Sequence, residues 1–364
     1  NSNRNVVYLQ YKAIIIFVMI RYNHHSQFDP NSIDVRLQHF RLGQILNMIH
    51  DHKIDLFLDE RPPLIKRSWS RKQESLFIES LLLKLPTQIF YFDGNDVPWK
   101  VIDGFHRLSV IYEFVNNAFR LEYLEYLSDQ CSNRYFKDLP GYLQARFLET
   151  EIVSYVINPG TPPHIRYNIF HRINETGERL SNQDIRCLFF NRRSVSFIIR
   201  LSELPLFVEL SANRVFHGKL EDLEYATHFV AFNSCYDSNM KSVEEALIRA
   251  MTFLEDISDS KYQRIEKQFE ETLYRAIRLF DEYLFRKPQK SVLYIKWSKM
   301  WNKDIYDMCM CCLAELNDHD FQNLLSKKVR FLEEFIEIYS NSSSKIGFPY
   351  FSTFRNLLSK YAFQ

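Results

Sequence analysis

The apolar residues in the first half of the chain follow two spacings, one helical and one strand-like. Downstream of Gly104, Leu108, Ile111, Tyr112 and Val115 fall at positions i, i+3, i+4 and i+7, the spacing of one buried helix face. Short runs rich in β-branched and aromatic residues, bounded by turn residues, indicate strands. These runs are residues 55–58, 87–92, 99–102 and 151–157. The alternation of helices and strands predicts an α+β fold for this half.

Two capping sequences indicate where helices begin. Ser70 precedes a helical run and Gln73 follows three residues later, which is the arrangement of a capping box. Ser181 and Asp184 have the same spacing before the next helical run. Further helices are expected within residues 32–50 and 162–174.

Helical periodicity continues through the second half of the chain. The helices predicted there cover residues 243–257, 262–284, 292–316, 321–339 and 351–361. We therefore expect two domains, an α+β domain over residues 1–190 and an all-helical domain over residues 191–364.

Composition narrows the class of protein. The 364 residues are 46% hydrophobic and carry a net charge of +1. The chain as a whole therefore lacks the basic excess of a nucleic-acid-binding protein, although this does not exclude a local basic face. The six cysteines follow no regular framework, which favours the cytoplasm over secretion. Cys309 and Cys312 lie in an apolar run that indicates buried core, so no metal site is expected.

An uncharged run near the start of the sequence bears on membrane association. Residues 13–20 contain no charge, but a bilayer-spanning helix needs about 20 apolar residues. We expect a buried strand at this run and no membrane partner.

The stretch from Asp103 to Arg107 is the main candidate for chemistry. It joins the strand ending at 102 to the helix after Gly104, and glycine permits a positive φ and the close approach of a ligand. Free N–H groups at a helix start attract anions. Arg107 can bind a phosphate, Asp103 can orient a water or a metal ion, and His106 can act as acid or base. The alternative is a plain turn capped by Asp103.

A basic cluster lies upstream of this stretch. It consists of Lys66, Arg67, Arg71 and Lys72. One interpretation is a set of contacts to the DNA backbone, and the other is a solvated, positively charged loop.

Several ordered sequence blocks resemble a known family. They are a basic residue before Trp69, the apolar run 76–83, Ile102-Asp103-Gly104-x-His106-Arg107-Leu108, and Phe170-x-Arg172-Ile173-Asn174-x-x-Gly177-x-x-Leu180-Ser181-x-Gln183-Asp184-Ile185-Arg186. Over roughly residues 26–190 the chain is similar to the domain-of-unknown-function family that forms the N-terminal part of GmrSD-type, modification-dependent restriction proteins. The resemblance implies a ParB/sulfiredoxin-like fold, an Asp-Gly-Gln-Gln-Arg motif and a role in phage defence.

The resemblance also implies a nucleoside triphosphate (NTP) site, with or without Mg²⁺. Asp103, Gly104, His106 and Arg107 match or nearly match the family motif and are the expected catalytic or binding residues. The second block supplies the other expected nucleotide-binding residues, Arg172, Asn174 and Gly177.

Two departures from the family pattern weaken the case for hydrolysis. Phe105 replaces the first glutamine of the motif, and this is also the place of the catalytic cysteine in sulfiredoxin. Leu64 and Ile65 stand where the family has Gln-Arg before the tryptophan. The metal-binding pattern of an HNH nuclease, which often follows this domain in the family, does not occur after residue 190.

Two functions from different classes remain open. The first is an NTP hydrolase coupled to DNA sensing. The second is a non-hydrolysing module that binds a nucleotide or a DNA phosphate as a sensor. In either case the helical domain is expected to recruit a protein partner or a second copy of the chain.

Overall fold

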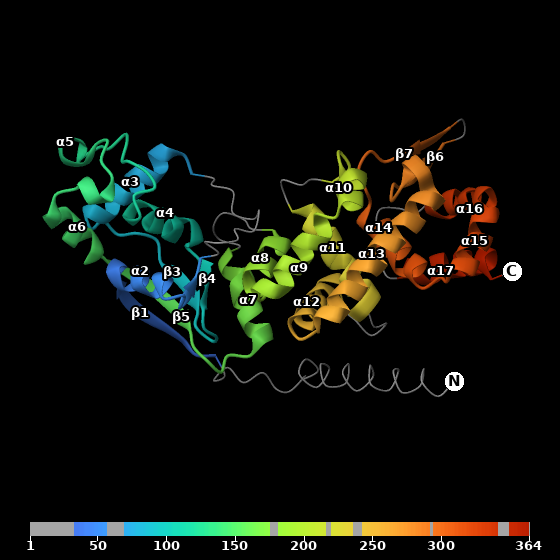
Figure 1. Cartoon of the computed structure of the whole chain (residues 1–364), viewed down its shortest axis with the longest axis horizontal. Coiled ribbons are helices and arrows are strands. Elements are labelled where there is room, and N and C mark those ends of the chain that lie inside the picture. The colour runs from blue at the N-terminus through green and yellow to red at the C-terminus, as the bar shows by residue number, and fades with distance from the viewer. Residues whose placement is uncertain are drawn as a thin grey trace. The chain divides into compact units, whose positions relative to one another are not determined.

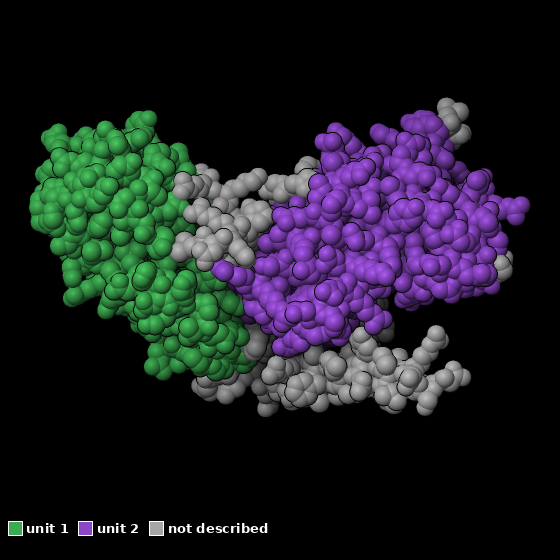
Figure 2. Space-filling model, viewed as in Figure 1, with its two compact units in different colours: residues 1–61, 65–180 green, residues 62–64, 181–364 purple. Residues whose placement is uncertain are grey.

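The computed structural model describes residues 33–56, 69–174, 181–215, 220–235, 242–291, 294–340 and 349–363. The chain forms two compact units (Figure 2). Unit 1 holds residues 1–61 and 65–180, and unit 2 holds residues 62–64 and 181–364. The main division thus falls after residue 180, ahead of the boundary at 190 expected from the sequence. The strand expected at residues 13–20 lies outside the described residues.

Unit 1 is built on a five-stranded mixed sheet (Figure 1). Its strands are β1 (Val35–Arg41), β2 (Ile54–Asp55), β3 (Phe90–Asp93), β4 (Trp99–Asp103) and β5 (Glu151–Ile157). They lie in the order β1-β5-β3-β4-β2. The β1–β5 and β3–β4 pairs are antiparallel, whereas β5–β3 and β4–β2 are parallel. The sequence predicted the bounds of β5 but missed β1.

The described part of unit 1 contains several helices, of which α3 (Arg71–Leu82) begins where its capping residues predict. They are α2 (Leu42–His50), α3 (Arg71–Leu82), α4 (Phe105–Val115), α5 (Ser128–Cys131), α6 (Gly141–Leu148) and α7 (Pro163–Asn174), with a short 3-10 turn, η2, at Phe136–Asp138. The Ser70 hydroxyl accepts a hydrogen bond from the Gln73 N–H, and the Gln73 side chain accepts one from the Ser70 N–H at 2.8 Å. This confirms the predicted capping box at the start of α3.

The core of unit 1 lies between the sheet and the helices. Alternate strand residues face opposite sides, so Phe90 and Phe92 of β3 are buried in the core, whereas Tyr91 stacks on Tyr155 of β5 with ring centroids 5.6 Å apart. Leu108 of α4 is fully buried in the same core, as its helical spacing predicts. Helix α3 packs against α4 and α6.

Unit 2 is mainly helical. Its helices are α8 (Asn182–Phe189), α9 (Arg192–Ser202), α10 (Pro205–Ser211), α11 (Glu221–Val230), the π-helix η4 (Ala231–Cys235), α12 (Val243–Glu255), α13 (Asp259–Phe280), the 3-10 turn η5 (Asp281–Tyr283), α14 (Lys303–Ala314), α15 (Asp318–Ser326), α16 (Lys328–Ser340) and α17 (Pro349–Ala362). The α+β class with a helical second half is confirmed. None of the helices in the described ranges is long and apolar enough to span a bilayer.

Two details of unit 2 differ from the sequence prediction. A two-stranded antiparallel ladder, β6 (Pro288–Lys290) and β7 (Ile295–Trp297), interrupts the helices. The single helix expected over residues 292–316 was therefore wrong, because Ile295–Trp297 pair as β7 and the helix, α14, begins only at Lys303. The helix expected over 321–339 divides at Lys327 into α15 and α16.

Candidate functional site

The junction between β4 and α4 requires a glycine for two reasons. Gly104 has φ +98°, a left-handed conformation that glycine adopts without a Cβ penalty. A Cβ on this residue would lie 2.4 Å from a ring carbon of Phe90, closer than atoms can approach. Conformation and packing therefore both explain this glycine.

Arg107 is bound inside the protein. Its guanidinium donates to the carbonyl oxygens of Gln88 and Ile89, the latter at 3.1 Å, and to the Asp103 carboxylate at 3.0 Å. It also lies over the Phe90 ring, 4.3 Å from the centroid. Only 6% of the residue is exposed, and this burial lowers the pKa of the guanidinium. These contacts give Arg107 a structural role, and its predicted phosphate contact stays a prediction.

The solvent-facing part of the junction is formed by Asp103 and the start of α4. The Asp103 side chain is 42% exposed although it also pairs with Arg107. Gly104, the N-cap residue of α4, has no side chain that could cap the helix, and the alternative of a turn capped by Asp103 stays open. His106 is half-buried, with its ring edge-on to Phe105 at 6.4 Å. An anion at this turn would meet backbone N–H groups and one carboxylate.

The helix that contains the start of the second family block packs against the strand that contains the start of the first. Helix α7 packs against β4, which ends at Asp103. Arg172 is exposed on α7, and Asn174 is the last residue of that helix. Gly177 lies outside the described residues. The structure therefore brings the two segments together but does not place all of their side chains around one site.

Sequence reasoning missed the ion pairs that attach α7 to the sheet. Arg166 of α7 lies 2.9 Å from the buried Asp93 carboxylate at the end of β3 and 3.6 Å from Asp96 in the following turn. Asp93 also accepts a hydrogen bond from the Asn95 N–H. A helical arginine and a strand-end aspartate give no local sequence signal, because 73 positions separate them.

The predicted DNA-contacting cluster is described only in part. Lys66 and Arg67 lie outside the described residues. Arg71 lies 2.6 Å from the buried Glu74 carboxylate and over the Phe119 ring at 4.2 Å, while Lys72 is exposed. Arg71 therefore supports α3 and the chain that packs on it, and the role of the cluster in DNA binding stays a prediction.

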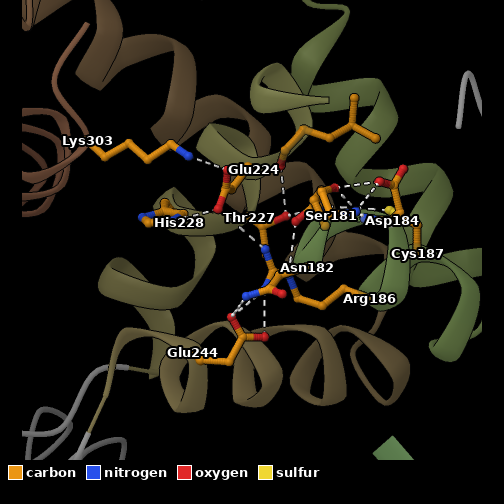
Figure 3. A network of polar contacts seen from close by, with 12 residues as sticks. Ser181, Asn182, Asp184, Arg186, Cys187, Glu224, Thr227, His228, Glu244 and Lys303 are labelled. Carbon is orange, nitrogen blue, oxygen red and sulfur yellow. Dashed lines mark hydrogen bonds and ion pairs between the residues drawn. The ribbon is translucent and has the colours of Figure 1, made fainter. Parts of the chain in front are cut away.

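Unit 2 contains a buried polar network centred on Arg186 (Figure 3). Arg186 is fully buried on α8, and its Nη1 donates to both carboxylate oxygens of Glu244 on α12 at 2.7 Å. Its Nε donates to Gln183, which in turn donates to Thr227 of α11 at 3.1 Å. The Ser-x-Gln-Asp-Ile-Arg block of the sequence thus connects α8 to two other helices of unit 2.

The network extends to a histidine and an aspartate that the sequence had not connected. His228 of α11 lies 2.8 Å through Nδ1 from Asp307 of α14, and both are buried. Glu224, one turn before His228, forms an ion pair with Lys303 (Figure 3). Burial raises the pKa of Asp307, against the opposing effect of His228. No cluster of three or more His, Cys, Asp or Glu able to hold a metal ion occurs among the residues described.

Comparison with known proteins identifies one family. Residues 66–190 match the family model described as "GmrSD restriction endonuclease, N-terminal domain". No curated protein and no solved structure matches the chain. The matched segment holds both motif blocks and ends after α8, so it crosses the division between the two units. Over residues 66–190, this chain therefore contains the N-terminal domain of the GmrSD restriction endonuclease family.

Proposed function

We propose that this chain is a DNA-associated component of a restriction or phage-defence system whose unit 1 binds the phosphates of a nucleotide without hydrolysing it. The observation that carries the proposal is the start of α4 directly after Gly104, beside the partly exposed Asp103 carboxylate. The family match supplies the restriction context.

The start of α4 has the properties of a phosphate site. The first N–H groups of a helix have no intrahelical partner, and the helix dipole favours negative charge there. Phosphate groups bind at helix starts that follow a glycine for this reason. Arg172 is an exposed cation on α7, the helix that packs against the strand leading to this turn.

The Asp103 carboxylate favours a metal-bound nucleotide over a free anion. A carboxylate repels a phosphate placed beside it, and Arg107 at 3.0 Å offsets only part of this charge. Mg²⁺ is usually bound by one or two carboxylates together with substrate phosphates. Asp103 would therefore hold Mg²⁺, which would supply positive charge to offset that of the nucleotide phosphates.

Two observations favour binding without hydrolysis. Arg107 donates to two carbonyl groups and to Asp103, so its charge is held inside unit 1 and away from a developing charge on phosphate. Phe105, the first residue of α4, offers no polar group to orient an attacking water.

Hydrolysis is the second candidate function, and one feature favours it. His106 is half-buried in the same first turn as the proposed phosphate site, within one helical turn of Asp103. A histidine there can accept a proton from a water that attacks the terminal phosphorus as the bond to the nucleoside diphosphate breaks, and Mg²⁺, if bound, would supply positive charge for that leaving group.

One experiment separates the two candidates. Thermal unfolding with each NTP and Mg²⁺ measures binding, and phosphate release with and without DNA measures hydrolysis. Stabilisation without phosphate release supports the sensor, whereas release above the buffer control that is lost in His106→Ala supports the hydrolase. If no nucleotide stabilises the protein, both are rejected.

A further inference from the structure

The segment of unit 2 that follows η5 has an unusual charge distribution. Residues 285–303 contain six lysines and arginines and no Asp or Glu, within a chain whose net charge is only +1. This segment forms the β6–β7 ladder (Figure 1). Lys290 and Lys296 lie in its two strands, Lys287 and Lys299 lie beside them, and Lys303 begins α14.

The register of the ladder decides which side chains share a face. Pro288 pairs with Trp297, Gln289 with Lys296 and Lys290 with Ile295. Backbone pairing continues on either side, because the Ser291 N–H donates to the Tyr294 carbonyl and the Ser298 N–H donates to the Lys287 carbonyl, both at 2.9 Å. Residues paired across strands point to the same side, and successive residues point to opposite sides.

One face of the ladder is anchored to unit 2. Pro288 is buried, and β6 packs against α16. Lys290 forms an ion pair with Glu337 of α16. Trp297 stacks on Tyr283 with ring centroids 4.6 Å apart and planes 19° apart. The ladder is therefore held in a defined position by contacts on this face.

The other face points to solvent and carries polar and cationic side chains. It comprises Lys287, Gln289, Ser291, Tyr294, Lys296 and Ser298. Gln289 and Lys296 are exposed, and Tyr294 is 64% exposed. Lys299, just beyond β7, is also exposed. Lys, Gln, Ser and Tyr are the residue types that donate hydrogen bonds to nucleic-acid phosphates.

Two arginines lie close together at the base of the ladder. The Nε of Arg286 is buried and has no hydrogen-bond partner within the described part of the chain. Burial lowers the pKa of Arg214, and the charge of Arg286 lowers it further. Adjacent cations repel each other, so an anion at this position would be stabilising.

We propose that the solvent-facing side of the β6–β7 ladder binds the phosphate backbone of double-stranded DNA. The proposal rests on the proposed function in one respect, namely that the protein associates with DNA. The major groove of DNA admits a two-stranded β-ribbon, and lysines on such a ribbon reach the flanking phosphates. The surface lies in unit 2, outside the Lys66–Lys72 cluster expected from the sequence.

The test measures binding of the full chain to a fluorescent DNA duplex by anisotropy at several salt concentrations. Lys296→Gln/Lys299→Gln removes two exposed cations, whereas Lys290→Gln, on the anchored face, is the matched control. The double variant should lose about tenfold in affinity per phosphate contact near 0.1 M salt, and the salt slope should fall by about 0.9 per contact. The control should bind like the unmodified protein.

Three results would overturn this proposal. They are no DNA binding by the unmodified chain, equal losses in the double variant and the control, and preferential binding of an RNA duplex or of anionic vesicles. Thermal unfolding of each variant with nucleotide keeps the two proposals distinguishable. If the Lys296→Gln/Lys299→Gln variant no longer binds DNA but is still stabilised by nucleotide, the result supports this inference, whatever the result for Asp103.

Discussion

The carboxylate of Asp103 and the guanidinium of Arg107 lie 3.0 Å apart across the glycine that starts α4. The two charged residues of the family motif thus bind each other, and Arg107 also ties the end of β4 to the backbone before β3. These contacts of Arg107 hold the strand–helix junction in shape, whereas phosphate binding at the start of α4 stays a proposal.

Removing the Arg107 side chain should lower the unfolding free energy of unit 1. Arg107→Ala removes hydrogen bonds to two backbone carbonyls, the ion pair with Asp103 and the contact with Phe90, so we expect a loss of about 3 kcal/mol in unfolding free energy. Urea denaturation measures this. Arg172→Ala, at an exposed residue of α7, is the control and should cost less than about 0.5 kcal/mol. Equal stability of the two variants would refute the structural role of Arg107.

Two left-handed glycines in the described part of unit 1 separate packing from conformation. Gly104 has φ +98° and contacts Phe90, whereas Gly160 has φ +103°, and within the described residues no atom lies within 4 Å of the place that a Cβ would occupy. Alanine at either position has a conformational cost of about 1 kcal/mol. Gly104→Ala should cost about 2 kcal/mol more, because the Phe90 ring must move. Equal midpoints of thermal unfolding for Gly104→Ala and Gly160→Ala would contradict this argument.

A buried carboxylate on α3 fixes the loop before α5. Glu79 is 2% exposed and accepts hydrogen bonds from the N–H groups of Glu125, Tyr126 and Leu127 at 3.0, 2.7 and 2.7 Å. Glu79→Gln replaces one acceptor oxygen by a donor, so we expect a loss of about 2–3 kcal/mol and faster amide hydrogen exchange at residues 125–127. Glu125→Gln, an exposed change in the same loop, should do neither.

The Arg186–Glu244 pair provides the corresponding test in unit 2. Glu244→Gln removes the carboxylate that lies 2.7 Å from the fully buried Arg186 cation and leaves Glu224, at 3.7 Å, as a more distant one, which should cost about 3 kcal/mol. Glu245→Gln is the matched control, because Glu245 pairs with Arg249 on the same helix and is partly exposed. Chemical denaturation followed by a unit 2 tryptophan, Trp301, gives both values. Equal destabilisation by Glu245→Gln and Glu244→Gln would contradict the proposed contribution of the Arg186–Glu244 pair to stability.

Local sequence patterns predicted the elements that depend on neighbouring residues. The Ser70–Gln73 capping box, the bounds of β5 and the burial of Leu108 and Ile111 in α4 each follow from residues close together in the sequence. Tyr112 and Val115, predicted on the same face of α4, are half-buried. β1 was missed because it is an edge strand whose exposed, mixed residues lack clear alternation. The β6–β7 ladder was missed because apolar residues within it also fit a helical period.

The contacts of the candidate site could not be predicted from the sequence. Arg107 reaches carbonyls 18 and 19 positions away, and Arg186 reaches a carboxylate 58 positions away. The motif indicated that the junction matters, but not that its arginine points inward. That distinction depends on tertiary packing, which residue type and spacing alone do not specify.

The most direct test of the account is thermal unfolding of the full chain with NTP and Mg²⁺, compared between the unmodified protein and Asp103→Asn. Asparagine keeps an oxygen that can accept from Arg107 but removes the charge that would hold Mg²⁺. Asp129→Asn, at an exposed residue of α5, is the control. We predict that at least one NTP raises the unfolding temperature of the unmodified protein and the control but not of Asp103→Asn. Equal stabilisation of all three proteins, or of none, would contradict a phosphate site at the start of α4.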